Sequence, residues 1–500
     1  MIKRLLFVFI ASLFIATACT DFLMLEPQDE LIREEYWKSE GDVVAVLGTA
    51  YAKMSDFLRE IYYWSELRGG LLSPYENRTS VSQLDFLNYN INQNNELVRW
   101  DDFYQVINIA NTIIEYAPLA EENDDTFSSE QLRGYVAEAY FIRSLCYFQL
   151  VKTFRDVPLI MKSYDTDSQD FRKAKSTESE IIAQLIDDLT RIVDDAFTPD
   201  DFELKAEKKG RATTNAIYAL LADIYLWNSD YELCLETCDR ISNVFLVEGE
   251  DYMSIFANEG NSQESIFELQ FDYQEYRTDN DLYSLTSNSR DGDRDFVVSE
   301  MMLGLYEEND LRQHAPPSTL YPAGGEVTVN TSDLSLWKYV GLGPYAYQYK
   351  NNERTENESD ANWIFYRLAE IHLMRAEAYA ELGQLSNALI HLNIIKNRAG
   401  LKDYTNANEQ DKLINEILNE RAREFFGEGK RWFDLVRISR RDVTNRLDII
   451  SDAVISNVEP RSRSAVASKI KDVNSWFLPI YYNELLLNDL LEQNVFYKTN

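Results

Sequence analysis

The chain has 500 residues, of which 84 are acidic and 49 are Lys or Arg, so its formal net charge is −35. A surface this acidic repels nucleic acid and excludes electrostatic attachment to anionic lipids. The three cysteines beyond Cys19 cannot all pair, and no nearby His or Cys completes a tetrahedral metal set. We therefore predict neither a disulfide scaffold nor a metal centre, and a hydrophobic core must stabilise the fold.

The first 18 residues have the pattern of an export signal. Two basic residues precede an apolar run over residues 5–15, and small residues then lead to Cys19. The run is shorter than the roughly 20 residues that span a bilayer, so we interpret residues 1–18 as a removed signal peptide. The pattern before Cys19 is similar to a bacterial lipobox, which predicts that fatty acids such as palmitate on Cys19 anchor the mature chain to a membrane. The alternative is ordinary cleavage near Ala18, which would leave a soluble periplasmic protein.

Apolar residues recur at three- and four-residue spacings through most of the chain, and Pro and Gly seldom interrupt them. This periodicity predicts helices at residues 40–58, 99–117, 128–154, 176–196, 212–228, 231–243, 362–382, 385–399, 409–427 and 429–440. Gly, Asn, Asp, Ser and Tyr concentrate in residues 244–360, which predicts strands and irregular loops there. We therefore expect a mostly α fold with three parts after the signal, at residues 19–243, 244–360 and 361–500.

An internal repeat is visible without gaps. Residues 221–241 and 375–395 carry Ala, Tyr, Leu and Ile at matching places, and Leu382-Gly383 makes the turn of the second copy. This is the pattern of a tetratricopeptide helix pair, which buries its apolar face by stacking on neighbouring pairs. The alignment places Cys234 and Cys238 at packing positions.

Acidic and basic residues alternate from Glu420 to Arg437, a composition that could suggest a catalytic site. Their helical spacing favours ion pairs instead. We predict that these charges fix how two helices join at Gly427 to Gly429, through Arg423, Glu424, Arg431 and Asp434.

The sequence predicts no enzyme and no cofactor. It contains no zinc-protease, serine-hydrolase or phosphate-loop motif, and no pair among its carboxylates is singled out for glycoside hydrolysis. His372 and His391 fall on the repeat helices and are interpreted as partly exposed structural residues. Residues 291–295 are similar to the opening of a calcium loop, but Met302 stands where that loop needs a bidentate Glu.

Aromatic side chains in irregular segments are the candidates for ligand binding. Aromatic faces pack on the apolar faces of sugar rings, while amides and charged groups bind the hydroxyls. Binding residues also favour loops on a rigid scaffold, and residues 62–89 and 273–349 qualify. We predict ligand contacts at Arg68, Tyr75, Arg78, Asn88, Tyr89, Tyr283, Trp337 and Tyr345. The tryptophans of predicted helices are assigned to the core: Trp100, Trp227, Trp363 and Trp432.

Short motifs in a fixed order give the chain its resemblance to a known family. They are Asp21-Phe22-Leu23, Tyr36-Trp37, Ala137-Glu138-Ala139 with Arg143 and Tyr147-Phe148, Gly210-Arg211-Ala212-Thr213, Tyr366-Arg367-Leu368-Ala369-Glu370, the run from Gly427 to Arg437, and Phe477-Leu478-Pro479-Ile480 with Gln493-Asn494. Through them the chain resembles the SusD/RagB family over essentially its whole length after Cys19. Tyr481 and Val495 depart from the family's closing pattern.

The resemblance implies a tetratricopeptide-like helical scaffold with an irregular, loop-rich ligand-binding lobe. It also implies capture of a nutrient at the surface of the outer membrane, either an oligo- or polysaccharide or a peptide. Delivery to a SusC-like, TonB-dependent β-barrel transporter would follow, without catalysis. The alternative is a helical-repeat scaffold that binds a protein partner at the outer membrane. An apolar groove along the repeat helices would favour that alternative.

Overall fold

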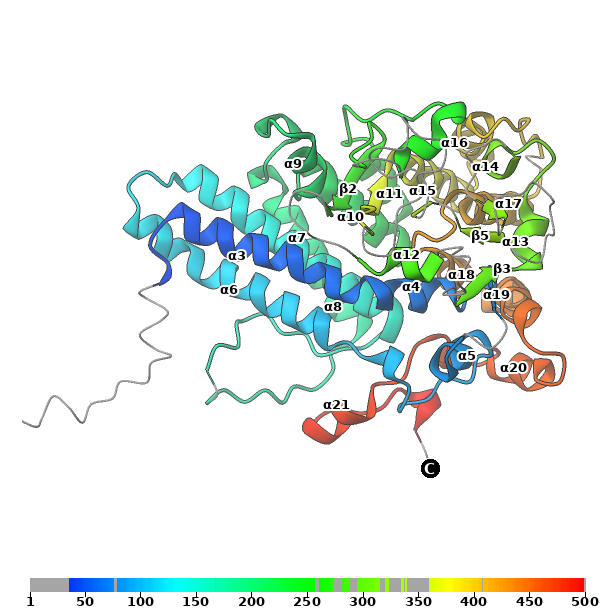
Figure 1. Cartoon of the computed structure of the whole chain (residues 1–500), viewed down its shortest axis with the longest axis horizontal. Helices are drawn as coiled ribbons and strands as arrows, with labels where there is room; N and C mark the ends of the chain where they lie inside the picture. The colour runs from blue at the N-terminus through cyan, green and yellow to red at the C-terminus, as the bar shows by residue number, and fades with distance from the viewer. Residues whose placement is uncertain are drawn as a thin grey trace, which may run out of the picture.

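The computed structural model describes residues 36–75, 79–166, 168–256, 260–272, 280–286, 295–314, 320–322, 334–336, 338–339, 359–406 and 408–498. Helices dominate this part of the chain, which confirms the predicted fold class (Figure 1). None of the helices in these ranges combines the length and the apolar character that crossing a bilayer demands.

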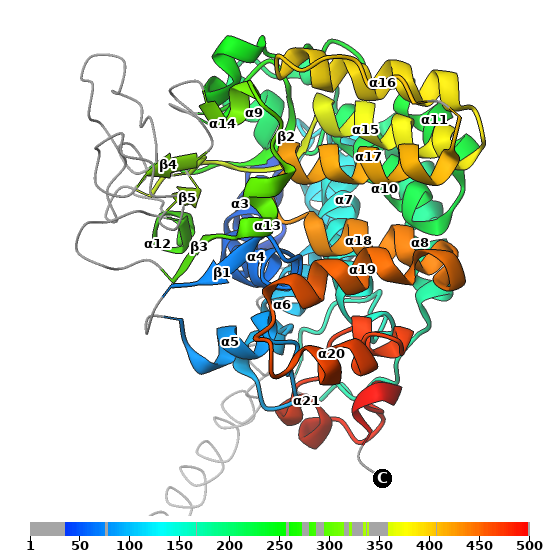
Figure 2. The ribbon, with the colours of Figure 1, turned by 90° about the vertical axis from the view of Figure 1, so that its right-hand side faces the viewer.

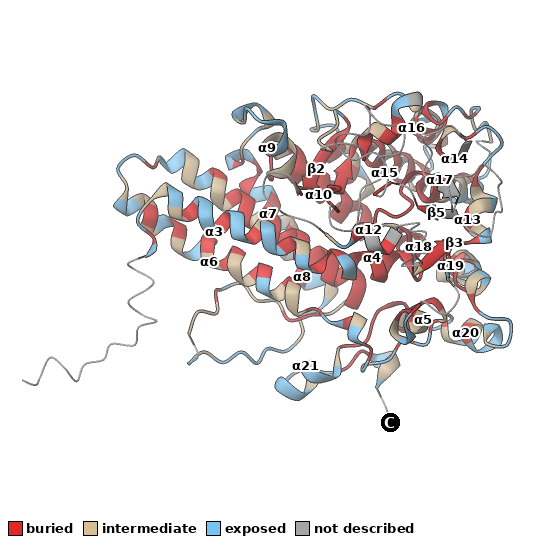
Figure 3. Ribbon diagram, viewed as in Figure 1, coloured by how far each residue is buried: buried red, intermediate tan, exposed pale blue. Residues whose placement is uncertain are grey.

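Four helices of the N-terminal part pack along one another (Figure 1). They are α3 (Glu40–Lys53), α6 (Asp101–Asn123), α7 (Ser129–Phe154) and α8 (Glu178–Ile192). Capping boxes set where two of them begin, because Ser128 accepts a hydrogen bond from Gln131 N at 3.2 Å and Thr177 accepts one from Glu180 N at 3.3 Å. The faces that these helices turn to one another are buried, and their outer faces are exposed (Figure 3).

The predicted repeat forms two antiparallel helix pairs. They are α10 (Thr214–Asn228) with α11 (Tyr231–Cys238), and α15 (Leu368–Glu381) with α16 (Leu385–Arg398). Helix α11 packs on α15, so the two pairs stack. Gly383 makes the second turn at φ +73°, a left-handed conformation that favours glycine. Cys234 and Cys238 are fully buried, as packing positions require.

The C-terminal part contains more helices than predicted. Two match predicted segments, α17 (Gln410–Glu424) and α18 (Arg431–Arg441), and three were not predicted: α19 (Val443–Asn457), α20 (Arg463–Lys469) and α21 (Tyr482–Leu487). Helix α19 buries Arg446, Ile450, Ala453 and Val454. Their three- and four-residue spacing is visible in the sequence and would have predicted this helix.

Strands in the described residues form three antiparallel two-stranded ladders. The pairs are β1 (Leu72–Pro74) with β3 (Phe296–Val298), β2 (Ser265–Leu269) with β6 (Trp363–Arg367), and β4 (Leu320–Pro322) with β5 (Leu334–Leu336). The prediction of a helix from residue 362 was wrong for residues 363–367, which form β6. Its run of aromatic and β-branched residues is buried on both faces, an environment that suits a strand.

Short helices complete the fold. They are α4 (Leu58–Glu66), α5 (Val81–Leu87), α9 (Lys205–Gly210), α12 (Leu282–Thr286), α13 (Glu300–Leu305) and α14 (Leu311–His314). The small ladders β1–β3 and β4–β5 lie with α12 on one side of the molecule, and the repeat pairs lie toward the other (Figure 2). The described ladders and the repeat pairs therefore occupy different sides of the molecule.

A buried cluster of charges joins the irregular part to the repeats. Glu424 of α17 accepts hydrogen bonds from Arg312 at 2.9 Å, from Arg367 at 2.5 Å and from Arg398. Glu264 also binds Arg367 and Arg398, each at 2.8 Å. Burial opposes ionisation of Glu424, but the three guanidinium groups hold its pKa well below the usual range. We call these five residues the Glu424 network.

The charged segment acts as a structural junction, although its pairing differs in part from the prediction. Asp434 of α18 does pair with α17, but its partner is Arg421, at 2.8 Å, which was not among the predicted residues. Arg423 instead pairs within α17 with Glu420 at 2.7 Å, and Arg431 donates to the carbonyl of Leu418 at 3.2 Å.

The first prediction concerns the Glu424 network. Glu424→Gln should lower the free energy of unfolding by about 3–5 kcal/mol, because three buried guanidinium groups lose their shared charge partner. Urea denaturation measures the change. The control is Glu492→Gln, whose partner is Lys498 and whose side chain is 74% exposed; it should leave the free energy of unfolding almost unchanged, because solvent screens the pair. Equal losses in the two variants would contradict the assigned role.

Two of the three histidines meet between α15 and α16. The Nδ1 atoms of His372 and His391 lie 3.1 Å apart, and the ring of Tyr379 stacks on His391. Burial is the main cause that lowers the pKa of each imidazole to about 4, and the neighbouring Arg375 adds to it. Both rings are therefore neutral near pH 7.

This pair gives the second prediction. An unfolded histidine titrates near pH 6.5, so the unfolded chain binds protons that the folded chain does not bind until about pH 4. The pair's contribution to the free energy of unfolding should be constant above about pH 6.5 and should fall as the pH decreases toward 4. The double variant His372→Gln, His391→Gln should have a flatter profile between pH 5 and 7 in urea denaturation. Identical slopes in the variant and the wild type would refute the assignment.

Candidate ligand-binding site

The β1–β3 ladder brings together the two aromatic stretches that the sequence singled out. Leu72 pairs with Val298, and Pro74 pairs with Phe296. The ladder is extended by one residue, because Tyr75 N donates to the carbonyl oxygen of Asp295 at 3.1 Å. Residues more than 200 positions apart thus share one edge of the molecule, on the left in Figure 2.

Asp295 organises this junction. Its carbonyl accepts a second hydrogen bond from Thr79 Oγ1 at 2.7 Å, and its carboxylate accepts one from Gln83 Nε2 at 2.8 Å. Gln83 Nε2 also donates to the Tyr63 hydroxyl at 3.0 Å, and burial raises the pKa of that hydroxyl to about 12. Helix α5 is therefore held against the ladder through side chains, with Tyr75 at its edge.

Helix α12 lies beside the same junction. Arg59, next to the start of α4, forms an ion pair with Asp281 at the start of α12. Tyr283 N donates to Ser359 Oγ at 3.0 Å, and Asn280 Nδ2 donates to the carbonyl of Ala361 at 2.8 Å. These bonds tie α12 to the segment that enters β6.

Three predicted contacts keep part of their side chains in solvent. Tyr75, Asn88 and Tyr283 are each half-buried. Asn88 ends α5 and donates from Nδ2 to the carbonyl of Leu84 at 3.0 Å. Tyr75 and Tyr283 carry the aromatic rings of this set.

Arg68 and Tyr89 are buried in the interior, whereas the sequence analysis predicted that they contact the ligand. Arg68 is 2% exposed, donates to the carbonyl of Trp476 at 2.5 Å and lies 3.8 Å from the ring centroid of Trp432. Tyr89 is 5% exposed, and its hydroxyl donates to the carbonyl of Ser475 at 2.7 Å. Both side chains fasten α4 and α5 to the C-terminal part. Their hydrogen-bond partners are 408 and 386 residues away along the chain, so no local pattern revealed the burial.

The other predicted positions lie outside the described residues: Cys19, Arg78, Trp337 and Tyr345.

Sequence reasoning missed the organising roles of Asp295 and Gln83. For Gln83 a signal was present, because Ser80 and Gln83 form a capping box at the start of α5. The described residues contain no group of three or more His, Cys, Asp or Glu side chains placed to hold a metal ion. Half-exposed aromatic rings, an amide and a fixed polar junction suit reversible binding.

Comparisons with known proteins agree with this architecture. One family model, described as the SusD family, matches residues 243–497, and another, described as starch-binding associating with outer membrane, matches residues 22–226. SusD-like protein P38 of Formosa agariphila is 25% identical, with 98% of each chain covered.

Solved structures share the fold. A SusD superfamily protein from Bacteroides vulgatus superposes with a TM-score of 0.75 at 22% identity, and the match covers 92% of this chain and all of that one. A laminarin-binding SusD-like protein superposes with a TM-score of 0.69 at 19% identity, with the same coverage. The first family model spans just over half of the sequence on its own, and the chain belongs to the SusD family.

Proposed function

We propose that the chain is a non-catalytic glycan-binding protein of the outer-membrane surface, which captures an oligo- or polysaccharide and delivers it to a SusC-like, TonB-dependent transporter. One observation carries the proposal. The β1–β3 ladder pairs residues 72–74 with residues 296–298, so the two aromatic stretches meet there, and Tyr75, Asn88 and Tyr283 of these stretches are half-buried. Such groups bind sugar rings and their hydroxyls.

Known relatives support the ligand class. The family model that matches residues 22–226 is described as starch-binding, and one structural neighbour is a laminarin-binding protein. Another neighbour is surface glycan-binding protein A from Bacteroides uniformis, with a TM-score of 0.71. A neutral glucan is therefore the first ligand class to test, with peptides as the second.

The surface of the repeats favours ligand capture over the scaffold alternative. On α10, α11, α15 and α16 the structure exposes only two large apolar side chains among the described residues, Leu233 and Ile390. They are 44% and 59% exposed, and they lie on different helices. Isolated side chains of this kind are normal on soluble proteins and do not form a peptide-binding groove.

The third prediction tests the ligand-binding edge. Tyr75→Ala and Tyr283→Ala should each weaken glycan binding about tenfold, because each removes an aromatic face from the site. Calorimetry with laminarin oligosaccharides and starch oligosaccharides measures the dissociation constant. Tyr482→Ala is the matched control, since Tyr482 lies on α21 and is 43% exposed. If both site variants keep wild-type affinity for the glycan that binds, the edge is not the site.

The fourth prediction concerns the membrane anchor. We propose that Cys19 carries the acyl chains that hold the protein at the outer membrane. Expressed in a bacterium that processes lipoproteins, the wild type should incorporate labelled palmitate and sediment with membranes. Cys19→Ala should lose the label and appear in the soluble fraction. A labelled, membrane-bound Cys19→Ala protein would refute this anchor.

A further inference from the structure

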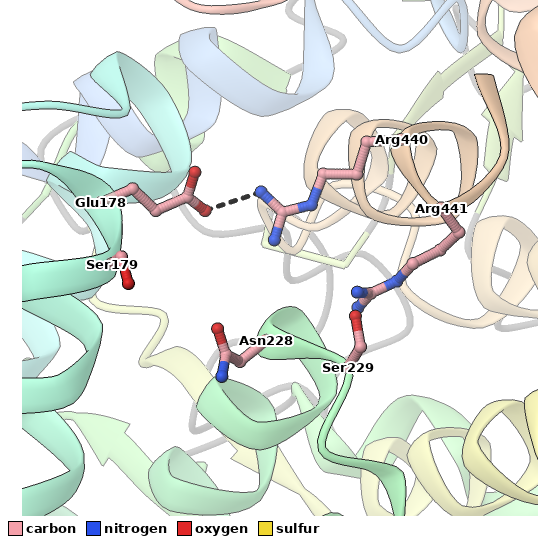
Figure 4. A pocket seen from close by; sticks show the side chains of 6 residues that line it. All are labelled: Glu178, Ser179, Asn228, Ser229, Arg440 and Arg441. Atoms are coloured by element: carbon pink, nitrogen blue, oxygen red, sulfur yellow. Dashed lines mark hydrogen bonds and ion pairs between the residues drawn. The ribbon is translucent and has the colours of Figure 1, made fainter.

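A polar cavity of about 460 Å³, shallow and widely open to solvent, lies where α8 begins and where α10 and α18 end (Figure 4). Its volume falls within the range of small-molecule sites. Six side chains line it: Glu178, Ser179, Asn228, Ser229, Arg440 and Arg441. The cavity belongs to the helical body and shares no residue with the β1–β3 edge.

The two arginines are fixed by the end of α10. Arg440 donates to the carbonyl of Trp227 at 2.5 Å, and its guanidinium lies 4.0 Å from the Trp227 ring centroid. Arg441 Nη2 donates to the same carbonyl at 2.9 Å and to that of Leu226 at 2.5 Å. Both carbonyls belong to the last turn of α10, where carbonyl oxygens commonly accept bonds from outside the helix; that of Leu226 also accepts one from Ser229 N at 3.3 Å. Both guanidinium groups are thus held in place at the cavity before any ligand arrives.

The cavity is short of negative charge. Its one carboxylate, Glu178, binds Arg440 at 2.6 Å and also accepts a hydrogen bond from Trp227 Nε1 at 2.7 Å. No described carboxylate lies within ion-pair distance of Arg441, whose Nε and Nη1 donate to no acceptor in the described part of the chain. The lining thus holds two guanidinium groups and one carboxylate in a chain of net charge −35, and the Asp230 carboxylate just outside it accepts a hydrogen bond from Asn228 Nδ2 at 2.6 Å.

The other lining groups specify more than an anion. Figure 4 shows Ser179 and Asn228 across the opening from Arg441, and Ser229 beside the Arg441 guanidinium. Two hydroxyls and an amide suit a ligand with several hydroxyl groups. Because Arg440 covers the ring of Trp227, that ring gives the cavity no open aromatic face. The guanidinium of Arg441 is the natural partner for a carboxylate, which it can bind in a planar, bidentate way.

We propose that this cavity binds a carboxylate-bearing, polyhydroxylated ligand of about monosaccharide size, such as a uronic acid, with Arg441 on the carboxylate and Ser179, Asn228 and Ser229 on the hydroxyls. The site is separate from the glycan-binding edge and does not depend on it. It gives the helical body a binding role of its own.

Ligand-observed NMR titration of the full mature chain tests the proposal with four probes: glucuronate, gluconate, glucose and inorganic sulfate. Glucuronate should bind and glucose should not. If gluconate binds as well as glucuronate, the site recognises the carboxylate and hydroxyls without needing a ring. If gluconate does not bind, the site also recognises the sugar ring. Sulfate that competes as well as glucuronate, or glucose that binds equally, would overturn the proposal, as would the absence of glucuronate binding.

Variants then place the ligand in the cavity. Arg441→Gln should weaken glucuronate binding about tenfold, because a charge-assisted hydrogen bond is lost. Arg133→Gln is the control, since Arg133 is 52% exposed on α7 and pairs with Asp195. Unchanged affinity in Arg441→Gln would exclude the site.

A variant that binds glucuronate more tightly than the wild type cannot owe its effect to a damaged fold. Glu178→Gln keeps an acceptor for Arg440 and Trp227 but removes the cavity's negative charge, so glucuronate should bind about threefold more tightly. Asp187→Asn, exposed on the same helix, should have no effect. Tyr75→Ala and Tyr283→Ala should also leave glucuronate binding unchanged, so failure of the glycan-binding edge and failure of this cavity are distinguishable. A Glu178→Gln variant that binds no better than wild type would count against the charge argument and overturn the assignment.

Discussion

The carboxylate of Glu424, surrounded by three guanidinium groups in the interior, is the constraint on which the two parts of the molecule depend. Arg312 comes from α14, Arg367 from β6 and Arg398 from α16, and Glu264 stands just before β2. Each charge would be costly to bury alone, and the cost is offset only when all the partners are present. The irregular part and the repeats are therefore stable in one relative arrangement, and partial assembly leaves an unpaired charge.

That junction also positions the edge that we propose as the ligand-binding site. Arg367 ends β6 and pairs with Ser265, the residue after Glu264, so two members of the Glu424 network meet at one end of the β2–β6 ladder. The segment entering β6 holds α12 through Ser359 and Ala361. On the other side, Asp295 and Gln83 fix β3 and α5 against β1. A site built in this way presents its aromatic rings on small elements that are each bound to a rigid body, which favours selective binding.

The charge of the protein is distributed unevenly. Arginines such as Arg312, Arg367 and Arg437 form ion pairs in the interior, where they are 1–2% exposed. Their carboxylate partners are equally buried, so the outer surface keeps the negative excess of the chain. The cavity between α8, α10 and α18 is a place where two guanidinium groups lie beside solvent. A strongly negative chain can thus discriminate among anions locally while it repels them globally.

The sequence by itself determined the helical class, the stacked repeat and the family, because each of these depends on local periodicity or on motif order. It also predicted that the alternating charges from Glu420 onward are structural. Tertiary structure alone decided the rest. The segment Trp363–Arg367 became a strand because β2 lies beside it, and Arg68 and Tyr89 became core residues because Trp432, Ser475 and Trp476 pack on them. Asp295 emerged as the organiser of the site only when β1 and β3 paired. Burial and pairing between distant segments are properties of the assembled chain, and no window of sequence contains both partners.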